Sequence, residues 1–353
     1  MPLTVRELSA EDFTLWDGLL ATSPQRCIFA QRWWMEIVTR GGVQLLGCFD
    51  TDRLVAGLPL WPCATFGVRR LRQPPLTPYW GPILRPIPGK YATRVSTEME
   101  ILRAFAAALT PWQDSMLAFH PSLDNWLPFH WSGYQQTTRY TYRIEALAEN
   151  LPVGKGLHRS VRNALNRAAN NQLTIKEMVD PMVIAEMSRL SMARQELQSS
   201  LEIRAFWSEL SQAATQRNCL LNAVAMDPQG EVHAGYAIVW DDRYAYDLYG
   251  GGDPRYRDSG GGTLALQHLL EAAAQVAPGF DFEGSMTESI GRFFRQFGGE
   301  LTSFLAVSRA ASRRINTARS LQSWWQNRLH HEGKSNCAPL PAKEAQAQTP
   351  TAT

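Results

Sequence analysis

The 353-residue sequence has no uninterrupted apolar run close to the roughly 20 residues that a membrane-spanning helix needs. It also lacks a basic N-terminal segment followed by an apolar stretch, which is the pattern of a secretory leader. These two absences predict a cytoplasmic protein with no membrane span. Cysteine is scarce as well, and its five residues form no CxxC pair and have no histidine at a zinc-ligand spacing. We therefore expect no metal site, and free thiols at Cys27, Cys48, Cys63, Cys219 and Cys337.

An excess of charge of one sign is absent too, because 35 basic and 33 acidic residues leave a formal net charge of +2. So small a net charge gives no long-range attraction to DNA, which we do not expect as a partner. Any binding of anions must come from local clusters of basic residues. Bulky apolar residues become rare beyond Gly333, and this composition predicts a disordered tail over residues 331–353.

The rest of the composition is that of a folded globular protein, with 44% apolar and 19% charged residues. A chain of this length favours two domains, each with its own core. Residues 149–156, ENLPVGKG, are rich in glycine and proline and lie near the middle of the chain. We place the boundary there, between an N-terminal domain of residues 1–150 and a C-terminal domain of residues 151–330.

The C-terminal half has the clearer pattern, because apolar alternation and turn residues coincide in it. It predicts a three-stranded antiparallel meander, a glycine-rich loop, a helix, a short strand, a short helix and a closing strand. The first predicted helix buries one face, formed by Leu266, Leu269, Leu270 and Ala273. The predicted strands lie at 220–226, 231–240, 243–250, 280–284 and 300–307, and the short helix at 288–298.

The N-terminal half runs through a similar order of strands and helices. The two halves also end alike, since LPFHWSGY at 127–134 and RFFRQFGGE at 292–300 each place aromatic residues shortly before a glycine. We interpret this likeness as the duplication of one unit.

The stretch DPRYRDSGGGTLALQHLLEAA, residues 253–273, places three glycines directly before the predicted helix. The first turn of a helix has N–H groups without intrahelical partners and carries the positive end of the helix dipole, so it can hold an anion. Gly260, Gly261 and Gly262 remove the side chains that would block an anion, while Thr263 caps the helix and Arg257 adds a cation. This arrangement suits a pyrophosphate. A flexible turn without a ligand is the alternative, because a single glycine motif is not specific.

The residues from Arg257 to Gly262 fit the R/Q-x-x-G-x-G/A pattern that GNAT-family acyltransferases place around the pyrophosphate of coenzyme A, and the order of elements resembles that fold. A closer resemblance covers nearly the whole chain. It is to the tandem-GNAT group that includes the FemABX peptidoglycan aminoacyltransferases and the BioF-like acetyltransferase proteins. The segments that carry it are FAQRWWMEIV, PPLTPYWGPIL, NWLPFHWSGYQQTTRYTYRIEA, LHRSVRNALNRAANNQLTI and DFEGSMTESIGRFFRQFGGEL.

This resemblance implies an α/β (α+β) fold of two tandem GNAT-like domains, each with a mixed, mainly antiparallel sheet flanked by helices. The N-terminal domain would be degenerate, and the C-terminal domain would carry the donor-binding loop. The strands at 243–250 and 280–284 would splay apart around the pantetheine arm of the donor. The family's basic residue near the reacting end of the donor corresponds to Arg295, where arginine replaces lysine and keeps only a charge-stabilising role. The alternative is a surface arginine beside Phe293 and Phe297.

Acyl transfer to an amine needs a deprotonated nucleophile and a stabilised oxyanion, and backbone N–H groups of a splayed strand supply the second. The candidate catalytic residues at strand ends beside the glycine loop are Glu283, our first choice, Asp247 and Tyr249. The structural alternative for Glu283 is an ion pair with Arg255 or Arg257. Proximity of the two substrates without an acid–base residue is a further alternative.

Residues 151–176 contain five basic residues and no acid. A helix there would bury the face around Val161 and Ala164 and would place Arg159 and Arg162 on another face, among asparagines. Such faces are often only solvated, but arginine and asparagine without acids also suit phosphate or carboxylate groups. In FemABX-like proteins the comparable helix faces the phosphates of the acceptor. Arg159 and Arg162 are therefore our candidate acceptor-binding residues.

Two further regions have alternative interpretations. Tyr79 and Trp80 in PPLTPYWGPIL are candidates to line an acceptor cleft between the halves, although proline-fixed turns over a core explain them equally well. A second acid-free region between Glu300 and Glu332 would bind transfer RNA or would simply pack as a terminal helix. It contains Arg309, Arg313, Arg314, Arg319, Arg328, Trp324 and Trp325.

These observations support three hypotheses about function. The first is an N-acyltransferase that moves an acyl group from an acyl-CoA thioester to a small amine in the inter-domain cleft, without a tightly bound cofactor. The second is aminoacyl transfer from charged transfer RNA to a peptidoglycan precursor or another small amine. This second hypothesis is less complete, because the chain lacks an inserted pair of long helices found in some members of the group. The third is a non-catalytic module that keeps the fold and binds a ligand.

Overall fold

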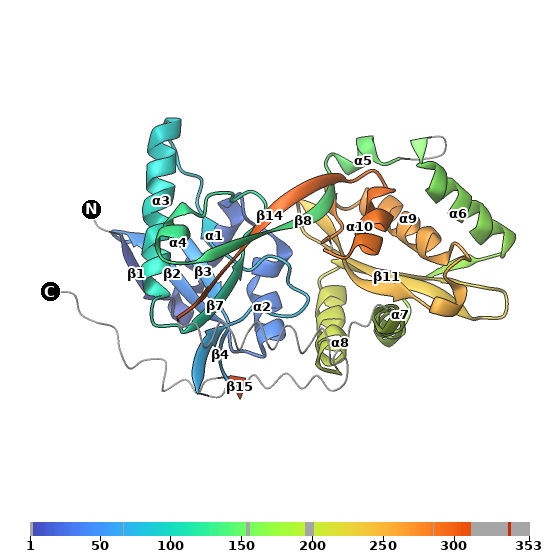
Figure 1. Cartoon of the computed structure of the whole chain (residues 1–353), viewed down its shortest axis with the longest axis horizontal. Coiled ribbons are helices and arrows are strands. Elements are labelled where there is room, and N and C mark those ends of the chain that lie inside the picture. The colour runs from blue at the N-terminus through green and yellow to red at the C-terminus, as the bar shows by residue number, and fades with distance from the viewer. Residues whose placement is uncertain are drawn as a thin grey trace. The chain divides into compact units, whose positions relative to one another are not determined.

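Figure 1 shows the computed structural model of the chain, which describes residues 3–65, 67–152, 156–194, 201–284, 286–311 and 338–339. The chain divides into two compact units. The first contains Met1–Thr138, Phe304–Leu329 and Lys334–Thr353, and the second contains Arg139–Ser303 and His330–Gly333. The predicted boundary at 150–156 falls inside the second unit, because strand β8 (Gln135–Ile144) pairs with β13 (Gly279–Asp281) of that unit.

The first unit contains an antiparallel sheet in the order β1-β2-β3-β6. Its elements are β1 (Thr4–Glu7), η1 (Ala10–Asp12), α1 (Phe13–Thr22), η2 (Ile28–Ala30), α2 (Arg32–Thr39), β2 (Gln44–Asp50), β3 (Arg53–Leu60), β6 (Ile83–Leu84), α3 (Tyr91–Ala108) and α4 (Leu127–Trp131).

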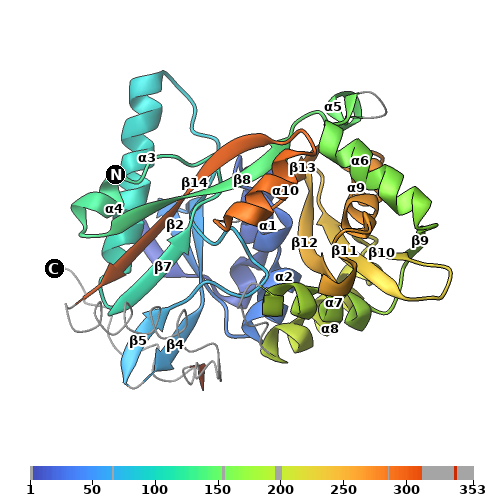
Figure 2. The same cartoon turned by 45° about the vertical axis from the view of Figure 1, so that its right-hand side comes forward.

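Alternation along β3 explains how helices cover both faces of this sheet (Figure 2). Ala56 and Leu58 belong to a buried core that includes Phe105 of α3. Gly57 points the other way, and a Cβ atom there would lie 2.5 Å from the ring of Trp16 in α1. The missing side chain therefore lets α1 pack closely on the sheet.

The first unit also contains a mixed set of strands. It comprises β4 (Pro62–Thr65), β5 (Val68–Leu71), β7 (Asp114–Ala118), the C-terminal part of β14 (Glu300–Ala310) and β15 (Ala338–Pro339). Strands β4 and β5 form a hairpin, β5 runs parallel to β7, and β7 pairs antiparallel with Ala306–Ala310 of β14. Leu71, Leu117 and Val307 from these strands join the same core as Phe105.

The second unit has one sheet in the order β8-β13-β12-β11-β10-β9, in which only β12 and β13 pair in parallel among the strands described. Helices α7 and α8 cover one face, and α6, α9 and α10 cover the other (Figure 1). Besides β8 and β13, the elements are α5 (Leu147–Asn150), α6 (Arg159–Asn170), β9 (Thr174–Glu177), α7 (Pro181–Arg194), α8 (Leu201–Gln216), β10 (Leu220–Met226), β11 (Val232–Trp240), β12 (Tyr244–Gly252), η4 (Pro254–Tyr256), α9 (Gly261–Ala273) and α10 (Glu288–Arg295).

The predicted helix faces are confirmed. In α9 the side chains of Leu266, Leu269, Leu270 and Ala273 are fully buried. In α6 Val161 and Ala164 are buried, whereas Arg159 and Arg162 are exposed. The predicted meander corresponds to β10, β11 and β12, and the α/β architecture with mixed, mainly antiparallel sheets is the one expected.

The predictions of free thiols and of a disordered tail include residues that the structure does not describe. Cys27, Cys48, Cys63 and Cys219 are free thiols, as predicted, and Cys337 lies outside the described residues. Of the predicted disordered tail, only Ala338–Pro339 is described. Among the described helices, none is both long enough and apolar enough to cross a bilayer.

Candidate active site

The two parallel strands of the second unit pair over a short distance and then part. Tyr244, Ala245 and Tyr246 of β12 lie opposite Gly279, Phe280 and Asp281 of β13, and the pairing ends there. The chain then turns away from β12 through Glu283 and Gly284, which both have positive φ angles, 55° and 61°. A cavity of about 520 Å³ opens where the strands separate. Residues Asp247–Gly252 line one side of it, and Phe282–Gly284 line another.

Strand β12 has a bulge at the point of separation. Ala237 of β11 lies opposite Tyr249, but the next residue, Ile238, lies opposite Asp247, so Leu248 has no partner in the ladder. Beyond the bulge, a Cβ atom at Gly251 would lie 2.6 Å from the Cβ of Ser191 in α7. Glycine at this position therefore allows α7 to lie close against β12 and form another wall of the cavity.

The glycines before α9 have three different roles. Gly260 has a φ of 89°, and a side chain there would collide with the backbone of α6 at Ala164. The N–H of Gly261 donates to Oγ of Ser259 at 3.2 Å. Gly262 faces the cavity, where the nearest atom to an added Cβ would be the Tyr236 hydroxyl at 3.5 Å.

The N-terminus of α9 therefore opens into the cavity. Gly260, Gly262 and Thr263 line it, together with Arg257. The first-turn N–H groups of a helix have no partner within the helix and carry a partial positive charge. The predicted donor-binding residues Gly260, Gly262, Thr263 and Arg257 thus lie together at this cavity, and their binding of an anion stays a prediction.

Helix α6 holds the loop that leads into α9. Nε of Arg167 donates to the carbonyl oxygen of Asp258 at 2.9 Å, and the side-chain amide of Asn171 donates to the carbonyl oxygen of Ser259 at 3.1 Å. Arg167 also lines the cavity. The basic, amide-rich face of α6 thus has a structural role at its C-terminal end, next to the N-terminus of α9.

Two carboxyl groups line the cavity near the point where the strands separate. Asp247 is 8% exposed, and burial raises the pKa of its carboxyl to about 7. Glu283 has a buried Oε1 with no hydrogen-bond partner, and burial raises its pKa well above the usual range. The negative charges of Asp281 and Asp247 raise the pKa of Glu283 further. Both carboxyl groups therefore keep their protons to a higher pH than an exposed carboxyl group does.

The alternative interpretation of Glu283 as an ion-pair partner finds no support in these contacts. Arg255 binds Asp253 at 2.7 Å, and Arg257 lies 3.2 Å from Asp258. Glu283 is instead fixed through its backbone, whose N–H donates to Oδ1 of Asp281 at 2.8 Å. Its carboxyl group is thus left to face the cavity.

Residues 156–287 match the family model described as an acetyltransferase (GNAT) domain. The second unit carries a GNAT domain. The matched residues include α9, the separating strands β12 and β13, and the carboxyl groups of Asp247 and Glu283 that line the cavity. The protein is accordingly an acyltransferase, as the sequence predicted. The search of curated proteins gives no match.

Solved structures resemble the chain over most of its length. The crystal structure of FemX has a TM-score of 0.61 at 10% identity and covers 86% of this chain and 96% of that chain. L-PGS from Bacillus licheniformis has a TM-score of 0.51 at 13% identity and covers 90% of this chain and 97% of that chain. A tandem GNAT protein from the clavulanic acid biosynthesis pathway has a TM-score of 0.48 at 12% identity and covers 88% of this chain and 99% of that chain. The likeness to FemX and to L-PGS shows that this chain shares their fold over most of its length.

Among the predicted catalytic residues, the GNAT domain brings Asp247, Tyr249 and Glu283 to one cavity. Tyr249 is 5% exposed and packs against the ring of Trp207 in α8. Arg295 is exposed at the end of α10 and is not among the residues that line this cavity. The positions of α10 that line it are Ser289, Ile290, Phe293 and Phe294.

The predicted acceptor residues lie elsewhere. Arg159 and Arg162 are exposed on α6 and do not line the GNAT-domain cavity described above. Tyr79 and Trp80 belong to the first unit, where they are 4% and 2% exposed, and the ring of Tyr79 contacts Phe29 and Phe304. Both therefore contribute to packing in that unit.

The second basic region is described only at its start. Nη2 of Arg309 donates to the carbonyl oxygens of Leu109, Thr110 and Trp112, which follow α3, so this arginine has a structural role. The remaining residues of the region, Arg313, Arg314, Arg319, Arg328, Trp324 and Trp325, lie outside the described residues.

Sequence reasoning missed several residues of the cavity. Arg167 sits on the predicted basic helix, but only the hydrogen bond to Asp258 distinguishes it from its neighbours. Ser188 and Ser191 come from α7, a helix without a chemical motif, and the glycines of β12 were the one signal that something packs closely there. The described residues contain no group of His, Cys, Asp and Glu side chains arranged to hold a metal ion.

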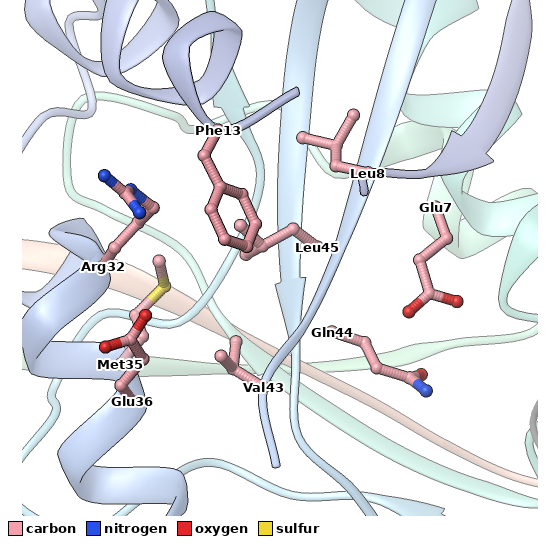
Figure 3. Close-up of a pocket in the computed structure, with 9 residues that line it drawn as sticks. All are labelled: Glu7, Leu8, Phe13, Arg32, Met35, Glu36, Val43, Gln44 and Leu45. Carbon is pink, nitrogen blue, oxygen red and sulfur yellow. The ribbon is translucent and has the colours of Figure 1, made fainter. Parts of the chain in front are cut away.

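The first unit has a smaller cavity of about 70 Å³, shown in Figure 3. Phe13, Met35 and Leu45 give it an apolar centre, with Arg32 on one side and Glu7 on the other. The guanidinium of Arg32 is already bound to Asp17 at 3.0 Å and lies over the ring of Phe13. Its charge is neutralised within the protein, so this cavity offers much less to a ligand than the GNAT-domain cavity.

Proposed function

We propose that the protein transfers an acyl group from a coenzyme A thioester to an amine. The observation that supports this most strongly is one continuous cavity that joins an open helix N-terminus to two buried carboxyl groups. The first feature suits a phosphorylated carrier, and the second suits proton removal from an amine. The distinctive requirement of acyl transfer is that both occur in one site.

The donor would bind along the line from α9 to the separating strands. Its pyrophosphate would accept hydrogen bonds from the N–H groups of Gly262 and Thr263, with Arg257 nearby as a cation. Its pantetheine arm would then extend between β12 and β13, beyond the last paired residues Tyr246 and Asp281. N–H groups of β12 on the side away from β11 would stabilise the oxyanion that forms at the thioester carbonyl.

Glu283 would act as the base. It would take one proton from the ammonium form of the acceptor, and the neutral nitrogen would attack the thioester carbon. Collapse of the tetrahedral intermediate breaks the C–S bond, and the departing thiolate takes up the second proton from the nitrogen. Asp247 assists because its negative charge raises the proton affinity of Glu283 toward that of an amine.

The test is thiol release from acetyl-CoA in the presence of a panel of primary amines. We expect the wild-type chain to release coenzyme A with at least one amine, and Glu283→Gln to lower the rate by about 100-fold or more. The matched control is Glu288→Gln, an exposed carboxylate on α10 that pairs with Arg292. Equal rates for wild type and Glu283→Gln would remove the base. Failure of every amine would leave the acyltransferase without the proposed donor.

Aminoacyl transfer from charged transfer RNA is the second candidate, supported by the exposed arginines of α6. Arg159 and Arg162 would then contact phosphate groups. Filter binding of transfer RNA at increasing salt decides, because neutralised phosphates give a steep loss of affinity with salt. We expect Arg159→Gln with Arg162→Gln to reduce that salt dependence if this candidate holds, and no retention of RNA if it does not.

Four further predictions from the sequence remain proposals. These are an amine acceptor in a cleft between the halves, Arg295 as a charge stabiliser, Tyr79 and Trp80 as acceptor residues, and a cytoplasmic location. A non-catalytic binding module is the outcome if Glu283→Gln, Asp247→Asn and Arg295→Ala together change nothing.

A further inference from the structure

Asp281, the last residue of β13, lies directly behind the proposed base and is fully buried. Its carboxylate accepts hydrogen bonds from three of the described residues. Oδ1 accepts from the hydroxyl of Thr141 at 2.5 Å and from the backbone N–H of Glu283 at 2.8 Å, and Oδ2 accepts from Nε of Arg143 at 2.8 Å. A buried carboxylate with this many donors keeps a defined orientation.

The bond to the backbone of Glu283 determines where that side chain points. Glu283 adopts a left-handed conformation, which a non-glycine residue rarely holds without support. An aspartate that accepts from the N–H two residues later supplies such support. Gly284 completes the turn, since a side chain there would collide with the backbone of Tyr140 and Thr141 in β8. The conformation of the turn that carries Glu283 is therefore fixed by its contacts with β8 and by the hydrogen bond to Asp281.

Strand β8 also supplies the positive charge. Arg143 lies opposite Asp281 in the antiparallel register, is 6% exposed, and stacks its guanidinium over the ring of Tyr244 at 4.5 Å. Thr141 and Arg143 both precede residue 156, where the match to the GNAT family model begins. The support for the proposed base thus comes from a strand outside that match.

We propose that Arg143 and Asp281, with Thr141, form a positioning group that holds Glu283 toward the cavity and controls its proton affinity. The charged groups around Glu283 are Asp247 on β12, Asp281 on β13 and, behind Asp281, Arg143 on β8. The proposal depends on the proposed function in one respect, which is that Glu283 is the proton acceptor.

We expect two variants of this group to change the proton affinity of Glu283 in opposite directions. In Asp281→Asn the anion next to Glu283 is lost, so the proton affinity of Glu283 falls. In Arg143→Met the anion of Asp281 is no longer balanced, so the proton affinity of Glu283 rises. A change that only loosened the turn would shift both variants in the same direction or in neither.

The test is a titration of the full-length chain labelled with ¹³C at the glutamate carboxyl carbons, read by NMR without any substrate. The resonance of Glu283 is assigned by its loss in Glu283→Gln. We expect its midpoint to move down by about one pH unit or more in Asp281→Asn and up by a similar amount in Arg143→Met. Arg143→Lys should stay near wild type. Arg292→Met, which breaks an exposed ion pair of the same domain, should leave the midpoint unchanged.

Shifts of the same sign in both variants, or none, would overturn the positioning group. If either variant fails to fold, the wild-type chain still gives an answer through amide hydrogen exchange of Glu283, which should be slow because its N–H is bonded to Asp281. Exchange at the rate of an exposed loop would contradict the proposal. Opposite shifts together with no thiol release would retain the positioning group and reject the proposed function.

Discussion

At the scale of single residues, the cavity combines two carboxyl groups that are costly to ionise. Asp247 and Glu283 both line the cavity, burial raises the pKa of each, and the charge of Asp247 raises the pKa of Glu283 further. Folded proteins tolerate such groups mainly at functional sites, where activity offsets a loss of stability. The pair is therefore expected to be a stability cost at alkaline pH.

Asp247→Asn should show this cost directly. The pKa of Asp247 is raised from 3.8 to about 7 in the folded chain, so its contribution to stability is complete below the unfolded pKa and is lost as pH rises through 7. The amide does not ionise and escapes this loss. Between pH 5 and pH 8 we expect the free energy of unfolding of the variant to gain about 2–3 kcal/mol relative to wild type in urea titrations. A constant difference across this range would show that Asp247 is not ionised at a cost.

At the scale of elements, the helix α9 and the loop before it were predictable because their determinants are local. Glycine at 260–262, the apolar face of α9 and the alternation in β10, β11 and β12 are all visible within a few residues. Helices α7 and α8 were not predicted, since their roles depend on contacts with β12 and β10 that lie far away in sequence. The contact between Asp281 and Arg143 spans 138 residues and leaves no local signal.

Gly262→Asp tests whether the N-terminus of α9 binds the phosphate groups of the donor. A side chain at Gly261 would come within 2.9 Å of His233, whereas position 262 has room, so Gly262 is the better position for a charge. We expect Gly262→Asp to weaken coenzyme A binding in calorimetry by about tenfold or more, equivalent to about 1.4 kcal/mol, because the new carboxylate competes for the same N–H groups. Gly156→Asp is the matched control, as it adds the same charge at an exposed position with open space. Equal affinities for the two variants would argue against phosphate binding at α9.

At the scale of the whole molecule, the division of the chain follows long-range pairing more than composition. The glycine- and proline-rich residues 149–156 look like a linker, but β8 before them belongs in part to the second unit. The presence of two compact units was predictable from the length of the chain and the order of its elements. The boundary between the two units was not predictable, because it depends on the pairing of β13 with β8, which lies far away in sequence.

A comparison of two shortened chains tests this division. Residues 139–303 keep Thr141 and Arg143, whereas residues 156–303 lack both of these partners of the buried Asp281. Breaking a buried ion pair by removing one partner costs about 3–5 kcal/mol. We expect the longer chain to unfold cooperatively at a higher temperature, and the shorter one to be markedly less stable or unfolded. Equal melting temperatures would place the functional boundary at residue 156 instead.

A crystal structure of the full chain grown with coenzyme A would test most directly whether the donor binds at the N-terminus of α9. We expect the pyrophosphate to lie at the N–H groups of Gly262 and Thr263, with the thiol arm between β12 and β13 and the sulfur near Asp247 and Glu283. An unoccupied cavity at millimolar coenzyme A, or a molecule bound away from α9, would contradict it.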